Sequence, residues 1–263
     1  MDASSILVRI RAVLGITRAE LARLAQLSPS TVGRIEKRTL DPTWETLTRV
    51  LETTGFHLHG ESIRPVCDPF AAAAARIALD RVLHTADAEP PAPVIDERTQ
   101  IWLDRWERTG WFTTEPMSLG LGTMARAAAI ISDHARRDVP RLPIGDGRRW
   151  RELALRIDES GTDYAVSDLA TAHELPVTSL CVQPKLYVRD PPSVAALLRE
   201  DVTTPGYGVL MISSEGPELD GATDGYALRF TSIGQAIMDA LAGTDHESHR
   251  AQAVLPWLLV ASH

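Results

Sequence analysis

The feature that most constrains this chain is a pair of short predicted helices, joined by only two residues, within residues 17–38. Glu20 follows Thr17 by three residues, a spacing at which each side chain can accept a hydrogen bond from the other residue's backbone amide at a helix start. Ser28 stands directly before Pro29, which marks a second start, because the first helical turn has no use for the amide that proline lacks. The sequence therefore predicts a helix-turn-helix.

The two predicted helices carry matching apolar positions on one side. Leu21 and Leu24 of the first helix, and Val32 and Ile35 of the second, are each spaced by three residues and so share a helix face. Packing these faces together leaves the opposite side of the second helix in solvent. That side carries small and hydroxyl residues at its start and cations at its end, namely Pro29, Ser30, Thr31, Gly33, Arg34, Lys37 and Arg38.

A helix in the DNA major groove requires this chemistry, with small or hydrogen-bonding side chains for base edges and cations for phosphates. At these residues the sequence resembles the lambda-repressor and Cro type of helix-turn-helix regulator, the XRE family, and the resemblance continues through residues 41–55. It implies an all-α DNA-binding domain over residues 1–64, in which the side that starts at Pro29 faces DNA and Ser30, Thr31 and Arg34 face bases. The residues that it places near phosphates are Arg18, Ser28, Lys37, Arg38 and Thr43.

Two positions depart from the family pattern. Gln26 occupies the turn position where the family usually has a glycine in the left-handed conformation, and a non-glycine residue there costs about 1 kcal/mol. Arg38 replaces the glycine that usually follows the recognition helix, and it either contacts a phosphate or is solvated. An alternative is a three-helix interaction module that has lost DNA binding. The cations Arg34, Lys37 and Arg38 favour the DNA-binding interpretation.

The charge of the chain is distributed unevenly. The net charge is -8, which by itself argues against binding to nucleic acid. Residues 1–64, however, carry nine Lys and Arg against seven Asp and Glu, whereas the remainder carries 18 against 28. DNA affinity therefore has to come from the first domain. The acidic remainder would repel the duplex or attract a basic protein partner.

The sequence indicates a cytoplasmic location. Cys67 and Cys181 are the only cysteines and lack the spacing of metal ligands, which suits free thiols in a reducing compartment. The N-terminus has no apolar core typical of a signal peptide. No later run approaches the roughly 18 apolar residues that a membrane span requires, so no membrane association is predicted.

The chain after the first domain divides into a connector and a second domain. Residues 65–97 contain a predicted helix at 69–84 and a proline-rich linker at 89–93. Residues 98–263 are predicted to form a mixed α/β (α+β) domain, so the fold class is multidomain. Its predicted helices lie at 99–106, 124–137, 151–160, 167–175, 193–200, 233–242 and 248–260, and its strands at 176–182, 185–188, 207–212 and 226–230.

Several residues outside the helix-turn-helix suggest sites that a simpler structural role explains better. His57 and His59 lack further ligands nearby, so a metal site is not expected. Residues 56–59 alternate, which fits a short strand or the approach to a fifth helix. Trp102 and Trp106 lie one helical turn apart, which favours core packing over stacking on a nucleotide.

No catalytic motif is present. The chain lacks a Gly-x-Ser-x-Gly elbow and a His-Glu-x-x-His pair. Four carboxylates that cluster in sequence are assigned to helix ends and turns rather than to acid-base chemistry, and they are Asp158, Glu159, Asp163 and Asp168. We therefore predict that the chain is not an enzyme and holds neither a cofactor nor a metal ion.

The second domain resembles the C-terminal half of the AbiEi antitoxins. The resemblance rests on residues 164–175, the strands that follow, SIGQAIMDAL and the closing HRAQAVLPWLL. It implies a module that neutralises a toxin or organises a dimer. The family normally carries a winged helix at its N-terminus, where this chain has the Cro-like segment.

Three hypotheses follow. The favoured one is a transcriptional repressor that binds double-stranded DNA as a homodimer on a pseudo-palindromic operator, with a partner protein, such as a cognate toxin, bound by the second domain. One recognition helix contacts few base pairs, so half-sites should lie about 34 Å apart or at multiples of that distance. The alternatives are a regulator whose second domain senses a small molecule and an enzyme fused to a DNA-binding module.

Overall fold

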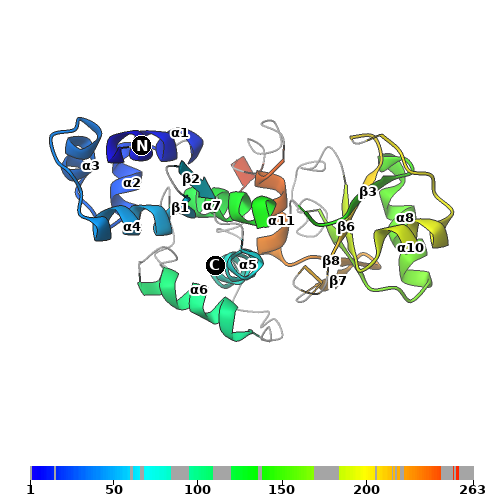
Figure 1. Ribbon diagram of the computed structural model, residues 1–263. Helices are drawn as coiled ribbons and strands as arrows, with labels where there is room; N and C mark the ends of the chain where they lie inside the picture. The colour runs from blue at the N-terminus through cyan, green and yellow to red at the C-terminus, as the bar shows by residue number, and fades with distance from the viewer. Residues whose placement is uncertain are drawn as a thin grey trace. The chain divides into compact units, whose positions relative to one another are not determined.

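The computed structural model divides the chain into two compact units (Figure 1). Unit 1 takes in the described parts of residues 1–83 and 95–136, and unit 2 those of residues 137–254. The structure describes residues 2–14, 16–59, 62–65, 68–83, 95–108, 120–135, 138–168, 184–204, 206–214, 216, 218, 219, 222–243, 251, 253 and 254.

Unit 1 begins with four short helices whose starts are set by capping side chains. Thr17 and Glu20 form the predicted capping box, because the amide of Glu20 donates to Thr17 Oγ1 at 3.2 Å and the amide of Thr17 donates to Glu20 Oε2 at 2.6 Å. Gln26 lies in the left-handed region at φ +52°, as the turn requires. The helices are α1 (Ala3–Leu14), α2 (Arg18–Leu24), α3 (Pro29–Glu36) and α4 (Trp44–Thr53).

The predicted packing of the apolar faces of α2 and α3 is confirmed. All four apolar side chains chosen from their spacing are buried, namely Leu21, Leu24, Val32 and Ile35. On α4, Val50 and Leu51 are buried as well, whereas Trp44 in the first turn is 70% exposed. Leu47, one turn further along, is only half-buried. Burial therefore fades toward the start of α4, and helical spacing alone does not reveal where the neighbouring helices end.

A two-stranded hairpin follows α4 in place of a fifth helix. Strands β1 (Phe56–His59) and β2 (Ser62–Pro65) pair antiparallel, with Phe56 opposite Pro65 and His59 opposite Ser62. The alternation noted in the sequence places Phe56 inside and His57 in solvent. The all-α expectation for residues 1–64 therefore holds only as far as Gly55.

Three longer helices complete unit 1, and they are α5 (Pro69–Leu83), α6 (Glu97–Arg108) and α7 (Gly120–Ala135). Helix α5 packs against both α6 and α7. Between α5 and α6, the guanidinium of Arg98 lies 3.8 Å from the centre of the Phe70 ring. Trp106 is buried in the core, as expected. Helix α7 starts at Gly120, four residues before the helix predicted at 124–137.

Helix α7 also contacts the N-terminal helices. Gly55, just after α4, has φ +74°, and a Cβ built on it would lie 2.8 Å from Ile131 Cδ1 of α7. This close approach groups α6 and α7 with the first helices. The division into units places residues 95–136 with residues 1–83, so the predicted start of the second domain at residue 98 lies within unit 1.

Unit 2 is built on a six-stranded mixed sheet with the order β3-β6-β5-β4-β8-β7. Strands β5 and β6 are parallel and connected through α10, β4 and β5 form an antiparallel pair, and β4 runs parallel to β8. The elements are β3 (Arg141–Ile144), η1 (Gly147–Arg149), α8 (Trp150–Glu159), β4 (Tyr164–Ser167), β5 (Lys185–Val188), α10 (Pro191–Leu198), β6 (Val209–Ser213), β7 (Thr223–Gly225), β8 (Leu228–Phe230) and α11 (Ile233–Leu241).

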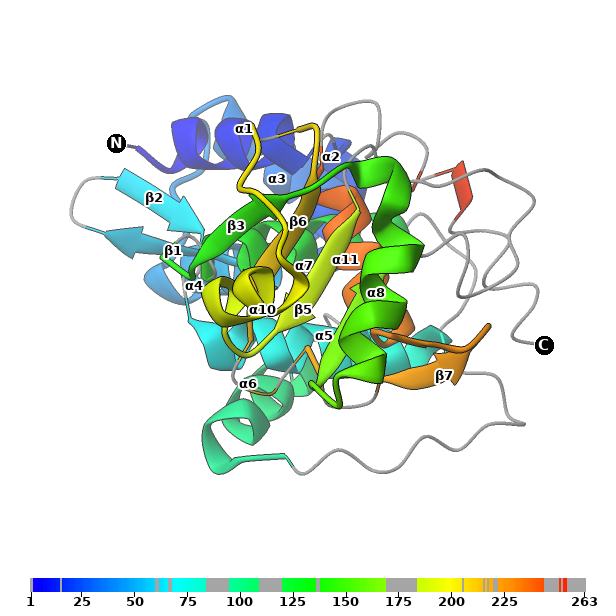
Figure 2. The same cartoon turned by 90° about the vertical axis from the view of Figure 1, so that its right-hand side faces the viewer.

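The two faces of this sheet are covered by different helices. Val166 and Leu186 belong to a core shared with α8 and α10, which lie on the same side in Figure 2. Tyr187 points to the other face, toward α11. The mixed α/β expectation is confirmed. The strand predicted at 176–182 lies outside the described residues, as do most of the helices predicted at 167–175 and 248–260.

Candidate DNA-binding surface

The start of α3 is organised by three neighbouring hydroxyl groups. Ser28 Oγ accepts a hydrogen bond from the amide of Thr31 at 3.0 Å, which caps the helix as predicted. The same oxygen lies 2.8 Å from the hydroxyls of both Ser30 and Thr31. Each hydroxyl has one proton and two acceptor sites, so this cluster keeps capacity for further partners. Pro29, next to it, is exposed.

The solvent side of α3 carries two cations whose side chains form no ion pair or hydrogen bond in the part of the chain that the structure describes. Arg34 and Lys37 are both exposed, opposite the buried Val32 and Ile35. Neither guanidinium nor ammonium forms an ion pair or hydrogen bond there. Both are therefore available to an anionic partner without first breaking a bond within the protein.

Arg38 and Thr43 lie beyond the C-terminal end of α3. Arg38 adopts φ +59°, the left-handed conformation that a glycine usually supplies, and its NH2 group pairs with Asp2 Oδ2 at 2.9 Å. Both side chains are exposed, so water screens the pair and it adds little to stability. Thr43 is also exposed and caps α4, where its Oγ1 accepts from the amide of Thr46 at 3.2 Å.

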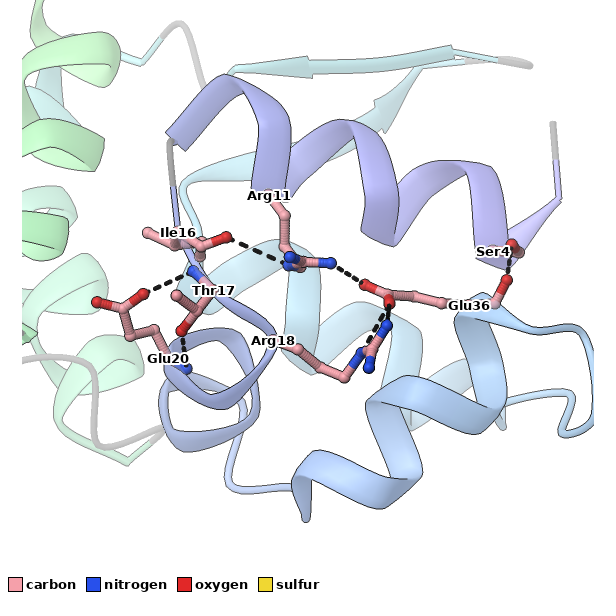
Figure 3. Close-up of polar contacts among 7 residues, drawn as sticks. All are labelled: Ser4, Arg11, Ile16, Thr17, Arg18, Glu20 and Glu36. Carbon is pink, nitrogen blue, oxygen red and sulfur yellow. Dashed lines mark hydrogen bonds and ion pairs between the residues drawn. The ribbon is translucent and has the colours of Figure 1, made fainter.

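A nearly buried carboxylate joins α3 to the two preceding helices (Figure 3). Glu36, whose side chain is 6% exposed, accepts from Arg11 NH1 at 2.7 Å through Oε1. Its Oε2 accepts from Arg18 Nε at 2.8 Å and forms an ion pair with Arg18 NH2 at 2.7 Å. Ser4 Oγ donates to the backbone oxygen of Glu36 at 2.6 Å. These bonds fix the orientation of α3 against α1 and α2.

Sequence reasoning singled out neither Glu36 nor Arg11. A signal existed, because a carboxylate in the last turn of a helix is disfavoured by the helix dipole and needs a compensating cation. Arg18, predicted near phosphates, forms the second half of that compensation in this structure. Arg18 therefore belongs both to the residues predicted to contact DNA and to the group that holds α3 against α1 and α2.

Residues 7–61 match a family model described as a helix-turn-helix domain. The match includes α2, α3 and α4 and all nine residues predicted to contact DNA. No curated protein and no solved structure matches the chain. The helix-turn-helix domain supports a DNA-binding regulator.

The charge of Glu36 makes the helix-turn-helix domain sensitive to acid. Burial raises the pKa of Glu36, but hydrogen bonds and positive charges from Arg11 and Arg18 outweigh it and hold the pKa below its ordinary value of 4.5. A carboxyl group with a lowered native pKa stabilises the fold at pH values above its unfolded pKa. That contribution disappears as pH falls through the native value.

We therefore expect Glu36→Gln to flatten the acid side of the stability profile. Below about pH 4.5 the stability of the parent should fall more steeply than that of the variant, because only the parent must protonate this carboxylate. Urea unfolding of unit 1 at a series of pH values would measure it. Glu45→Gln, at an exposed carboxylate of α4, should follow the parent, and parallel curves for all three proteins would contradict the role of Glu36.

The other candidate sites do not assemble. Within the described residues, no group of three or more His, Cys, Asp or Glu side chains could hold a metal ion. Asp168 is buried at the end of β4, whereas Asp158, Glu159 and Asp163 are exposed, so the four carboxylates do not converge. Among the described helices, none is both long and apolar enough to cross a membrane.

A buried carboxylate in unit 2 has a structural explanation. Asp239 of α11 is 2% exposed and accepts hydrogen bonds from Ser167 Oγ at 2.7 Å and from the Tyr187 hydroxyl at 2.8 Å. Lys185 Nζ donates to the backbone oxygen of Asp239 at 2.7 Å. These bonds link α11 to β4 and β5, so the cluster fixes the helix against the sheet.

Proposed function

We propose that this protein is a sequence-specific DNA-binding transcriptional regulator that acts through α3. The observation that carries the proposal is the exposed side of α3, where Arg34 and Lys37 stand free of partners among the described residues, beside a cluster of hydroxyl groups. A helix of this kind fits the major groove, where hydroxyls and arginine contact base edges and lysine contacts phosphates. Ser30, Thr31 and Arg34 are assigned to bases.

The same proposal assigns the protein to a homodimer that acts as a repressor. One α3 spans too few base pairs for strong discrimination, so two copies on a pseudo-palindromic operator supply it. The half-sites then lie about 34 Å apart or at multiples of that distance. Phosphate contacts come from Arg18, Ser28, Lys37, Arg38 and Thr43.

The test is selection of bound duplexes from a random-sequence pool by the full chain. Duplexes of about 30 base pairs are long enough for two half-sites. We expect enrichment of one motif with two-fold symmetry, which then binds more tightly than the starting pool in a fluorescence anisotropy titration. An unenriched pool, together with no binding at low salt, would exclude the function.

Lys37→Ala is expected to lower affinity for every duplex to a similar degree. Lys37 carries charge but is assigned to no base, so its loss should remove about one released counterion and reduce the slope of log K against log salt by about 0.9. Titrations of the selected operator and of random duplex across a salt series measure both slopes. Arg49→Ala, which removes a cation of α4 paired with Glu45, serves as the control. Equal slopes for Lys37→Ala and the parent contradict the assignment.

A second assignment concerns unit 2. The excess of acidic residues beyond residue 64 favours a basic protein partner, and we propose a toxin that the protein neutralises while repressing its own operon. Co-expression with the product of the neighbouring gene should give a complex that survives purification. A small-molecule-responsive regulator is the alternative outcome, and it predicts a ligand-dependent rise in the melting temperature of the isolated protein.

A further inference from the structure

The side chain of Arg18 lies flat across the middle of α3. A Cβ built on Gly33 would approach Arg18 Cδ at 3.3 Å, Nε at 3.5 Å and Cζ at 3.6 Å. Gly33 is buried although its helix neighbour Arg34 is exposed, because the Arg18 side chain lies over it. Glycine is a poor helix former, so its place at the centre of α3 has a steric reason. A methyl group at this position would require Arg18 to shift by a few tenths of an ångström, and a larger side chain would displace it.

Glu36 determines how this guanidinium is oriented. Its Oε2 accepts a hydrogen bond from Nε and forms an ion pair with NH2, so two of the three nitrogens of Arg18 point toward the protein (Figure 3). The remaining nitrogen, NH1, has no hydrogen-bond partner in the described part of the chain. The side chain as a whole is 45% exposed. A planar guanidinium held on one edge presents its other donors in a fixed direction.

The need to neutralise Glu36 does not by itself explain the position of Arg18. Arg11 already neutralises Glu36 from α1, through the other carboxylate oxygen. The three groups together therefore carry one excess positive charge, and Arg18 is the more exposed of the two arginines. This excess lies beside α3, the helix assigned to the major groove.

We propose that Gly33 and Glu36 are positioning residues for DNA binding and that they act through Arg18. Glu36 fixes two nitrogens of the Arg18 guanidinium. Gly33, which has no side chain, leaves room on the surface of α3 for the Arg18 side chain. The third nitrogen of Arg18 then contacts a DNA backbone phosphate. The proposal rests on the proposed function. It adds that the DNA-facing surface contains a part of α2 whose position is set by two residues of α3 that touch no DNA.

The test is a double-mutant cycle on the full chain, with the selected operator and a random duplex as probes. Arg18→Ala should weaken binding to both by about tenfold and lower the salt slope by about 0.9, as loss of one phosphate contact requires. Gly33→Leu should have the same two effects, because leucine displaces the arginine. In the Arg18→Ala background, Gly33→Leu should change affinity less than about twofold, since residues that act through one another are not additive.

Two further variants separate positioning from folding. Gly33→Ala adds a single methyl group and improves helix propensity, so it should raise or preserve the melting temperature of unit 1 while weakening DNA binding in the parent background only. Glu36→Gln should likewise weaken DNA binding in the parent background and have no further effect in the Arg18→Ala background. Both comparisons remain informative if Gly33→Leu unfolds the domain.

The outcomes are distinct. If a Gly33 substitution lowers DNA affinity equally in the parent and in the Arg18→Ala background, the new side chain itself contacts DNA. That result overturns the proposal. Unchanged affinity and salt slope for Gly33→Ala and Gly33→Leu in the parent background also overturn it. In both cases the parent still binds its operator, so the proposed function stands. A parent chain that binds neither probe overturns both.

Discussion

Replacing Ile35 with alanine is expected to lower the free energy of unfolding of unit 1 by about 2–5 kcal/mol. Ile35 is 1% exposed and lies on the inner side of α3, where α1 and α2 pack against that helix. Removing its side chain costs the transfer free energy of three carbons and leaves a cavity that short, capped helices cannot easily close. Urea unfolding, followed by hydrogen exchange of the amides in α1–α4, measures the loss in this part of the chain.

Trp44→Ala is the matched control, because it deletes a larger side chain from the same group of helices. Trp44 is mostly exposed, so its removal should change the free energy of unfolding by no more than about 0.5 kcal/mol. Helical spacing alone would rank both residues as core. Equal losses for the two variants would mean that the inner side of α3 is wrongly assigned.

Local chemistry explains why the first helices could be predicted from sequence. The caps at Thr17, Ser28 and Thr43 each involve a side chain and an amide three residues apart. The left-handed conformation of Gln26, which the family resemblance implies, lies in the short turn between α2 and α3. Such interactions are complete within one turn of chain, so the sequence contains all of their partners.

The support beneath α3 could not be predicted in the same way. Glu36 meets Arg11 across 25 residues and Arg18 across 18, and no spacing rule selects these pairs from the other charges of the domain. The Gly55 contact with Ile131 spans still more chain and decides where unit 1 ends. In unit 2, Asp239 finds Ser167 at a separation of 72 residues. These interactions depend on the packing of whole elements.

The predicted surface itself separates into two groups once its contacts are known. Arg34 and Lys37 have no partner among the described residues, while Arg18 and Arg38 are paired with Glu36 and Asp2. The sequence placed Arg34 near bases and the other three near phosphates, without reference to partners within the protein. This difference in pairing matters for DNA binding, because an unpaired side chain can reorient to hydrogen-bond a base edge, whereas a paired side chain presents its charge in a fixed position.

Arg34→Ala is expected to weaken binding to the selected operator by about 1–3 kcal/mol, or roughly 5- to 150-fold in Kd. Arg34 is the only cation among the residues assigned to bases, and an unpaired guanidinium can donate two parallel hydrogen bonds to O6 and N7 of a guanine. Its loss should therefore cost discrimination as well as affinity. Anisotropy titrations of the operator and of random duplex at one salt concentration give both quantities.

Arg34→Lys separates a base contact from a phosphate contact. Lysine keeps the charge but not the paired donors, so it should retain binding to random duplex and lose part of the preference for the operator. Replacing guanines of the operator one at a time by 7-deazaguanine removes N7 and should identify the base that Arg34 contacts. At that base, the replacement should weaken binding of the parent but not of the Arg34→Ala variant. If Arg34→Ala weakens operator and random duplex by the same factor, and the salt slope falls with it, Arg34 contacts a phosphate, and the specificity must come from the hydroxyl cluster at the start of α3.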